Sequence, residues 1–226
     1  MIPLKDDNPS RSVPIINILL ILINVLVFVY QFFFLPQGPA FLIKTYGFVP
    51  HAMHHTNMLS IHSSLATAAT LFSAMFIHGG WLHMLGNMLY LFIFGDNVED
   101  RLGHLRYLVF YLLCGITAAL VHAAIFPESR VPSVGASGAI AGVLAAYMLC
   151  FPRARITTLI IIFFFFRIVR IPAIILLGLW IVLQIISGLT ELTARAGGIA
   201  WFAHMGGFAA GLVLLLVMRP RAGAHK

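Results

Sequence analysis

Charged side chains are scarce in this sequence. They make up 9% of its 226 residues, whereas a soluble domain carries about 25%. Hydrophobic residues account for 61% of the chain and the mean hydropathy is +0.98, which is typical of a protein embedded in a lipid bilayer. The net charge of +7 does not indicate a nucleic-acid partner, because the basic residues gather at the ends of apolar runs.

Cysteine is also rare. Cys114 and Cys150 each lie inside an apolar run, which excludes a disulfide framework and a zinc site built from cysteines. We expect both to be packing residues. The first apolar run is too long for the core of a cleaved signal peptide and is not followed by a small-residue cleavage site, so we expect a spanning segment there.

Acidic residues are missing from the apolar runs. A proton-coupled pump or an ion transporter usually carries an intramembrane acid, an aspartyl intramembrane protease needs two, and a zinc protease of the H-E-x-x-H type needs a glutamate beside its histidine. The sequence therefore argues against all three classes. The acids, which lie outside the runs or at their edges, are Asp6, Asp7, Asp96, Glu99, Asp100, Glu128 and Glu191.

Apolar segments of about 20 residues can cross a bilayer as helices. Six segments qualify, the fourth at the short limit: 15–35, 76–95, 104–126, 135–151, 172–190 and 200–218. The apolar segment 156–166 is too short to span and is rich in β-branched and aromatic residues, so we predict an interfacial hairpin or loop there. The predicted fold is an all-α polytopic bundle of six transmembrane helices.

The positions of Lys and Arg predict the orientation of this bundle. Three basic residues fall in outer segments if the N-terminus lies inside: Lys44, Arg130 and Arg195. Eleven fall in inner segments: Lys5, Arg11, Arg101, Arg106, Arg153, Arg155, Arg167, Arg170, Arg219, Arg221 and Lys226. This bias predicts that both termini are cytoplasmic. The expected organisation is a cytoplasmic N-terminal segment (1–14), a membrane domain (15–218) and a basic cytoplasmic tail (219–226).

Few polar residues enter the predicted spans. The second span carries His78, His83 and Asn87, the fourth begins with Ser137 within "SVGASGAIAG" at 133–142, and the sixth carries His204 near its start. Each has an ordinary explanation when it is considered alone. A histidine or asparagine in a membrane often only hydrogen-bonds to a neighbouring helix, and a serine among glycines and alanines is more often a packing residue than a nucleophile.

The predicted topology brings three of these residues to one depth. The second, fourth and sixth spans all run from outside to inside, so His83, Ser137 and His204 fall in the outer half of the bilayer. His83 and Asn87 share a helix face because they are four residues apart. Small-xxx-small pairs let helix backbones approach closely, and the fourth and sixth spans each carry one: Gly138 with Gly142, and Gly207 with Gly211.

A close approach of these two helices would have chemical meaning. Serine is a weak nucleophile until a base takes its proton, and with no acid available the arrangement predicts a Ser137–His204 dyad rather than a triad. The first N–H groups of the helix that Ser137 opens, together with His83 and Asn87, could stabilise an oxyanion. Such a site must open to water through a polar cavity at the outer face.

Four motifs resemble the rhomboid family of intramembrane serine proteases: "GASG" at 135–138, "HGGWLHMLGN" at 78–87, "AHMGGFAAG" at 203–211 and "GDNVEDRLG" at 95–103. The resemblance extends over about residues 14–218. It implies that Ser137 is the nucleophile, that His204 is the general base and then the acid, and that His83 and Asn87 stabilise the oxyanion. It also implies that Gly135 lies beside that oxyanion hole.

The same resemblance implies further roles. Structural roles are implied for His78, Glu99 and Arg101, and the implied substrates are membrane proteins cleaved in or near the outer part of a transmembrane helix, with no cofactor. Entry between the second and fifth helices would make Trp180 and Gln184 candidates for lining the gate. The segment 188–199 would be a flexible cap over the site. The compact six-span form suggests a prokaryotic cell membrane, with the active site open to the extracytoplasmic side.

The long first outer loop departs from the family pattern, because it lacks the Trp-Arg pair that some members carry there. It contains His51, His54, His55 and His62 instead. The spacing of the first three could bind a metal on a helix, but surface or interfacial histidines are the default interpretation and we assign no metal.

Two alternatives to a protease remain open. One is a catalytically inactive relative that binds membrane proteins, which is disfavoured because both dyad residues are present. The other is a channel or small-solute transporter whose polar outer cavity is a permeation path, and the lack of intramembrane charges and of inverted repeats argues against it.

Overall fold

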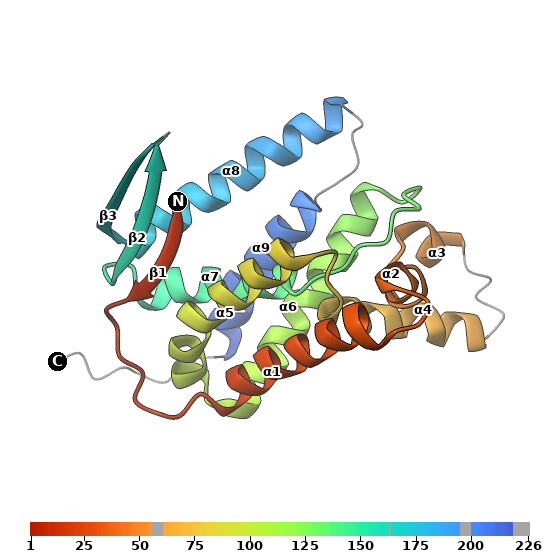
Figure 1. The fold of residues 1–226 in the computed structure, drawn as a ribbon, viewed down its shortest axis with the longest axis horizontal. Helices are drawn as coiled ribbons and strands as arrows, with labels where there is room; N and C mark the ends of the chain where they lie inside the picture. Colours follow the sequence, from red (N-terminus) through yellow and green to blue (C-terminus); the bar gives the residue numbers. More distant parts are fainter. Residues whose placement is uncertain (56–60, 163, 195–199, 219–226) are drawn as a thin grey trace.

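The computed structural model of the protein describes residues 1–55, 61–162, 164–194 and 200–218 (Figure 1). The predicted tail 219–226 lies outside the described residues. Each of the six predicted segments contains a helix: α1 (Ile15–Val29, continued by the π-helical turn Tyr30–Phe34), α5 (Trp81–Leu102), α6 (His104–Ile125), α7 (Ser137–Cys150), α8 (Ala173–Ala194) and α9 (Trp201–Met218). The first outer loop folds into α2 (Pro39–Tyr46), α3 (Pro50–His55), α4 (Ile61–Ser73) and a 3-10 turn (Ala74–Phe76).

Most of these helices are long and apolar enough to cross a membrane. Among the described residues, four helices are each long and apolar enough to cross a membrane without a second helix: α1 with its π-helical turn, α6, α8 and α9. The segment Leu65–Phe76 and α5 would supply a fifth crossing, as a pair bent by 80°. α7 has 14 residues and is shorter than a full span. The chain is therefore a polytopic helical membrane protein.

Two predicted boundaries are wrong. α5 covers Trp81–Leu102 rather than 76–95, so His78 precedes the helix instead of lying within it. α8 continues to Ala194, so the first part of the predicted cap, residues 188–194, is helical. Residues 195–199 lie outside the described part of the chain. The apolar pattern ends before the helix does because a helix can extend past the hydrocarbon region, where the backbone keeps its own hydrogen bonds.

α7 lies at the centre of the bundle, where it packs against α5, α6, α8 and α9. Every residue from Gly138 to Tyr147 is buried. Its packing against α9 depends on glycine, since a Cβ at Gly207 or Gly211 would overlap backbone atoms of Gly138 or Gly142, respectively. The two helices therefore approach at backbone distance, as the small-xxx-small pairs predict.

A small antiparallel sheet stands beside the bundle. The strands β2 (Arg155–Ile162) and β3 (Phe165–Pro172) form a hairpin, which confirms that part of the prediction for 156–166. The N-terminal strand β1 (Ile2–Asp6), which the hydropathy pattern did not reveal, pairs with β2 to give the order β1-β2-β3. In Figure 1 the sheet lies at one end of the molecule and α2–α4 lie at the other.

Glu99 holds the start of α1 against the end of α5. Its carboxylate, only 1% exposed, accepts hydrogen bonds from the backbone N–H groups of Ile16 (3.0 Å) and Asn17 (2.7 Å). It also lies 2.5 Å from His104 Nδ1. These contacts satisfy N–H groups that a helix start leaves without partners.

Arg101, near the end of α5, places its guanidinium 4.9 Å from the centre of the Phe151 ring. The contacts of Glu99 and Arg101 therefore join α5 to α1 and to the end of α7.

Candidate active site

The site begins at the turn that leads into α7. Gly135 has φ +117°, in the region that favours glycine, and its N–H donates to the Ala74 carbonyl (2.8 Å). Just before it, Phe48 and Ser133 exchange two backbone hydrogen bonds of 3.0 and 2.7 Å. Ser137 is the first residue of α7, so its hydroxyl is carried by a turn that is fixed to the first outer loop.

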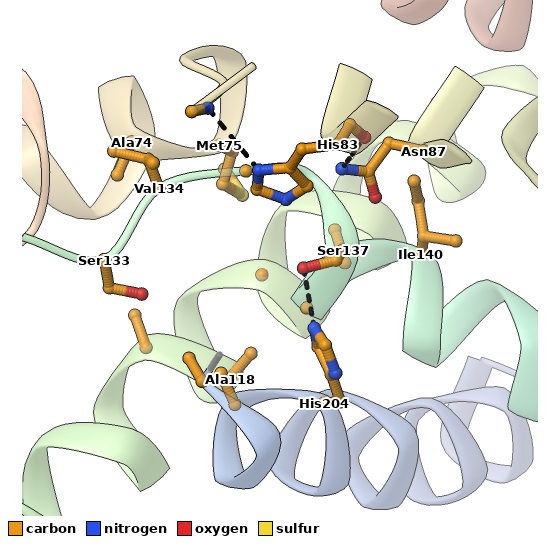
Figure 2. A pocket seen from close by; sticks show the side chains of 18 of the residues that line it. Ala74, Met75, His83, Asn87, Ala118, Ser133, Val134, Ser137, Ile140 and His204 are labelled. Atoms are coloured by element: carbon orange, nitrogen blue, oxygen red, sulfur yellow. Dashed lines mark hydrogen bonds between the residues drawn. The ribbon is translucent and has the colours of Figure 1, made fainter. Parts of the chain in front are cut away.

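Ser137 and His204 form a hydrogen bond. Oγ of Ser137 lies 2.8 Å from Nε2 of His204, and Figure 2 shows the two side chains pointing toward each other from α7 and α9. The glycine contacts between these helices permit the distance. The structure thus brings together the two residues of the predicted dyad.

Gln184 of α8 contacts the other nitrogen of the same imidazole. Its Oε1 lies 2.7 Å from Nδ1 of His204, and Gln184 is only 7% exposed. With the amide oxygen as acceptor, Nδ1 carries the proton and Nε2 presents its lone pair to the Ser137 hydroxyl. This is the tautomer that a general base for serine requires.

His83 and Asn87 of α5 lie on the side of Ser137 opposite His204 (Figure 2). Nδ2 of Asn87 donates to the His83 carbonyl (3.0 Å). A Cβ at Gly135 would come within 2.6 Å of the His83 ring and 3.7 Å of Asn87 Nδ2, so the backbone of Gly135 passes directly beside both side chains. The predicted oxyanion-stabilising residues are therefore neighbours.

The backbone adds further donors at this point. The first regular hydrogen bond of α7 runs from the Ile140 N–H to the Ala136 carbonyl (3.0 Å). The N–H groups of Ser137 and of the two residues after it precede that bond, and the first N–H groups of a helix have no acceptor inside it. Such groups favour negative charge.

These residues line one cavity of about 670 Å³, which is mostly apolar. It includes Ser137, His204, His83 and Asn87, together with the two residues predicted at the gate, Trp180 and Gln184. The Trp180 ring centre lies 6.0 Å from that of His204. Gln184 lines the cavity but also contacts the dyad, a role that the gate prediction did not include.

His78 lies behind His83. It is fully buried, and its ring centre is 5.2 Å from that of His83. Its carbonyl accepts a hydrogen bond from Gln31 Nε2 (3.0 Å), which joins the segment before α5 to the end of α1. These contacts agree with the structural role that the resemblance implies.

The contact between Gln184 and His204 is the feature of the site that sequence reasoning missed. The only available signal was that Trp180 and Gln184 share a helix face in a span otherwise poor in polar residues. Gln184 and His204 lie far apart in the sequence, on different helices. The sequence therefore does not show which nitrogen of the His204 ring the amide contacts.

Comparisons with known proteins agree with the resemblance. The family model described as the Rhomboid domain matches residues 66–221. RHOMBOID-like protein 4 of Arabidopsis thaliana is 34% identical over 155 residues, which are 68% of this chain and 35% of that protein. Rhomboid-like protein 11, chloroplastic, of the same organism is 40% identical over 77 residues, 34% of this chain and 27% of that protein.

A bacterial protein also matches. Rhomboid protease GluP of Bacillus subtilis (strain 168) is 41% identical over 78 residues, which are 34% of this chain and 15% of that protein. The chain spans less than half the length of each of these three relatives. The matched family region, 66–221, contains every residue of the cavity named above.

Proposed function

Because the chain belongs to the rhomboid family, we propose that it is an intramembrane serine endopeptidase. Its substrates would be membrane proteins, cleaved in or near the outer part of a transmembrane segment. The observation that carries this proposal is the 2.8 Å contact between Ser137 Oγ and His204 Nε2. One relative, GluP, is named a rhomboid protease.

The first half of the reaction forms an acyl-enzyme. Ser137 Oγ attacks the carbonyl carbon of the scissile bond while His204 Nε2 takes the hydroxyl proton, and a tetrahedral intermediate results. His204 then gives this proton to the leaving amine, and the C–N bond breaks. In the second half, water loses a proton to His204 Nε2 and attacks the ester carbonyl. The C–Oγ bond then breaks, His204 returns that proton to Ser137 Oγ, and the new carboxyl end is released.

Negative charge develops on the carbonyl oxygen in both halves. The backbone N–H of Ser137 and the side chains of His83 and Asn87 would donate to this oxygen. Gly135 lets the chain pass close to them, because any larger residue there would strike the His83 ring. Removal of one such donor typically lowers the rate by ~10²–10³-fold.

Gln184 supplies the orientation that an aspartate supplies in a triad. Its amide oxygen would hold the Nδ1 proton while His204 is neutral and also after His204 has become an imidazolium. The amide carries no charge, so it fixes the ring and its tautomer without strongly stabilising the imidazolium. We assign Gln184 as a positioning residue, since it acts through His204.

Substrate and lipid would meet the cavity from the side. Trp180 of α8 lines the cavity, and separation of α5 from α8 would open it to the bilayer. The peptide bond must leave its helix before attack, because helical hydrogen bonds shield its carbonyl.

The Lys and Arg count supports an active site on the extracytoplasmic side, and the proposed location is a prokaryotic cell membrane.

Labelling and cleavage test the dyad. The protein purified in detergent is treated with a fluorophosphonate probe, and cleavage of a transmembrane substrate is assayed in parallel. We expect Ser137→Ala to abolish both signals, because no nucleophile remains, and His204→Ala to lower both by roughly 10⁴-fold or more. Ser133→Ala is the matched control, since Ser133 lines the same cavity.

The outcomes separate the alternatives. Labelling that survives in Ser137→Ala excludes the assigned nucleophile. Wild-type protein that captures the substrate but neither reacts with the probe nor cleaves supports an inactive membrane-protein binder. Solute flux across proteoliposomes that continues in Ser137→Ala supports a transporter.

A further inference from the structure

Two histidines and a glutamate form a cluster outside the cavity of the candidate active site. His51 and His55 lie on α3, and Glu128 lies in the segment between α6 and α7. Oε1 of Glu128 is 3.0 Å from His55 Nε2, and Oε2 is 3.4 Å from His51 Nδ1. One ligand atom from each of the three residues lies within 4.8 Å of the other two.

We propose that His51, His55 and Glu128 bind a divalent transition-metal ion, with Zn²⁺ as the first candidate. Two imidazoles and a carboxylate are a common zinc donor set. Histidines four residues apart on a helix present their rings to the same side, and here the ring centres are 4.1 Å apart. Imidazole ligands favour Zn²⁺ over Mg²⁺ or Ca²⁺, which prefer oxygen.

A shielded nitrogen with no hydrogen bond is the second observation. His51 Nδ1 is shielded from solvent and makes no hydrogen bond among the described residues, although a carboxylate oxygen lies nearby. A shielded nitrogen that has only this 3.4 Å contact and no hydrogen bond is poorly satisfied in a purely structural histidine. A metal ion between the nitrogen and the carboxylate would satisfy both.

The backbone holds the ligands in place. The His51 N–H donates to the Ser129 carbonyl (2.9 Å), next to Glu128 in the chain, and the Ser129 N–H donates to the Phe126 carbonyl (3.0 Å). The ring of His54 faces another partner, with its Nε2 3.3 Å from the Ala123 carbonyl. The turn that carries Glu128 is therefore docked on α3, and little rearrangement is needed for an ion to bind.

The cluster joins two segments that support the candidate nucleophile. α3 follows Phe48, which pairs with Ser133 four residues before Ser137. A metal ion at the cluster would tie the first outer loop to the segment that leads into α7. Glu128 is 73% exposed, so the site faces water, and a water molecule would complete a tetrahedral coordination.

Metal binding tests the proposal without any measurement of proteolysis. Full-length protein with a histidine-free affinity tag is stripped with a chelator in detergent and titrated with Zn²⁺ against a chromophoric competitor, and with Co²⁺ by visible absorption. We expect one equivalent to bind, with the d–d bands of tetrahedral Co²⁺. His51→Ala and Glu128→Gln should each weaken binding by more than the ~10–100-fold typical of losing an outer-shell partner.

His54→Gln is the matched control, because its ring points to the Ala123 carbonyl rather than to Glu128. Zn²⁺ should raise the melting temperature of wild type and of this control but not of Glu128→Gln. Glu128→Gln changes an exposed side chain, so the test does not depend on a variant that fails to fold. Wild-type protein that binds no Zn²⁺, or variants that bind it as wild type does, would overturn the proposal.

Discussion

His204 is held through both nitrogens of its ring. Nε2 contacts Ser137 at 2.8 Å and Nδ1 contacts Gln184 at 2.7 Å. The predicted dyad included no acid, and the structure supplies a neutral amide where a triad has a carboxylate. A ring held on one side only could adopt the wrong tautomer or turn away from Ser137. In the proposed mechanism, the amide therefore decides how much of the time His204 is ready to act as a base.

Gln184→Leu should lower kcat of the proposed protease by up to ~10²-fold, part of the 10²–10⁴ that a positioned base contributes, with a smaller change in KM. Gln184→Glu should restore much of kcat, because a carboxylate accepts the same proton. The carboxylate also favours the imidazolium, so the acidic limb of the kcat/KM profile should move to higher pH.

Leu183→Ala, a change at an exposed neighbour on α8, is the control for Gln184. A purely structural role for Gln184 would lower activity in Leu and Glu variants alike and leave the pH profile in place. That result would remove the assignment as a positioning residue.

Helix packing sets the distance between the dyad residues. α7 and α9 touch through their backbones because glycines face each other at Gly138 and Gly207, and at Gly142 and Gly211. Van der Waals packing drives helix association in a bilayer, where the hydrophobic effect between helices is absent. The small residues thus contribute stability and also bring His204 to Ser137.

Gly207→Ala should separate the two helices, since its Cβ would overlap the Gly138 carbonyl. Overpacking typically costs ~1–3 kcal/mol, so we expect a lower melting temperature in detergent and a large loss of probe labelling. Gly178→Ala on α8 is the control, because a Cβ there meets nothing within 4 Å; it should be neutral or slightly stabilising. Equal melting temperatures and labelling in the two variants would contradict this packing role.

Contacts between distant parts of the chain hold the whole molecule together at the sheet end. β1 pairs with β2, and Asp6 at the end of β1 accepts hydrogen bonds from Tyr147 Oη (2.6 Å) and Asn97 Nδ2 (3.2 Å). The N-terminal segment is thereby attached to both α5 and α7. At the opposite end, α3 and the segment after α6 meet at the proposed metal cluster.

Asp6 should make stability depend on pH. The pKa of its carboxyl is raised from 3.8 to about 6: burial is the largest cause, the hydrogen bond from Tyr147 opposes it, and the charges of Asp96 and Asp7 add to it. The folded protein then binds a proton more tightly than the unfolded chain. The contribution of Asp6 to the free energy of unfolding therefore increases as the pH falls from above 6 toward 3.8.

Asp6→Asn should remove this contribution, because its amide oxygen still accepts from Tyr147 but does not titrate. The measurement is the melting temperature in detergent at pH 7 and pH 5, compared with Asp100→Asn as a control, because Asp100 is not among the charges that raise the pKa of Asp6. If wild type and Asp6→Asn show the same change between the two pH values, Asp6 is not the group responsible.

The sequence alone determined the class of fold and the residues to consider. Long apolar runs without acids leave few structures other than a helical membrane bundle, and the six predicted segments each contain a helix. The few polar residues inside these runs were conspicuous for the same reason. Ser137 and His204 could be paired from depth and from the glycines near them, and their catalytic roles stay predictions.

Only the tertiary structure decided how these residues meet. The partner of His204 Nδ1, the pairing of β1 with β2 and the position of Glu128 beside His51 and His55 all join segments far apart in the chain. The hydropathy pattern can show which face of a helix is apolar. It does not show which other helix packs against that face, because lipid and protein interiors are equally apolar. That choice is made by close packing and by single hydrogen bonds, which exist only once the bundle has formed.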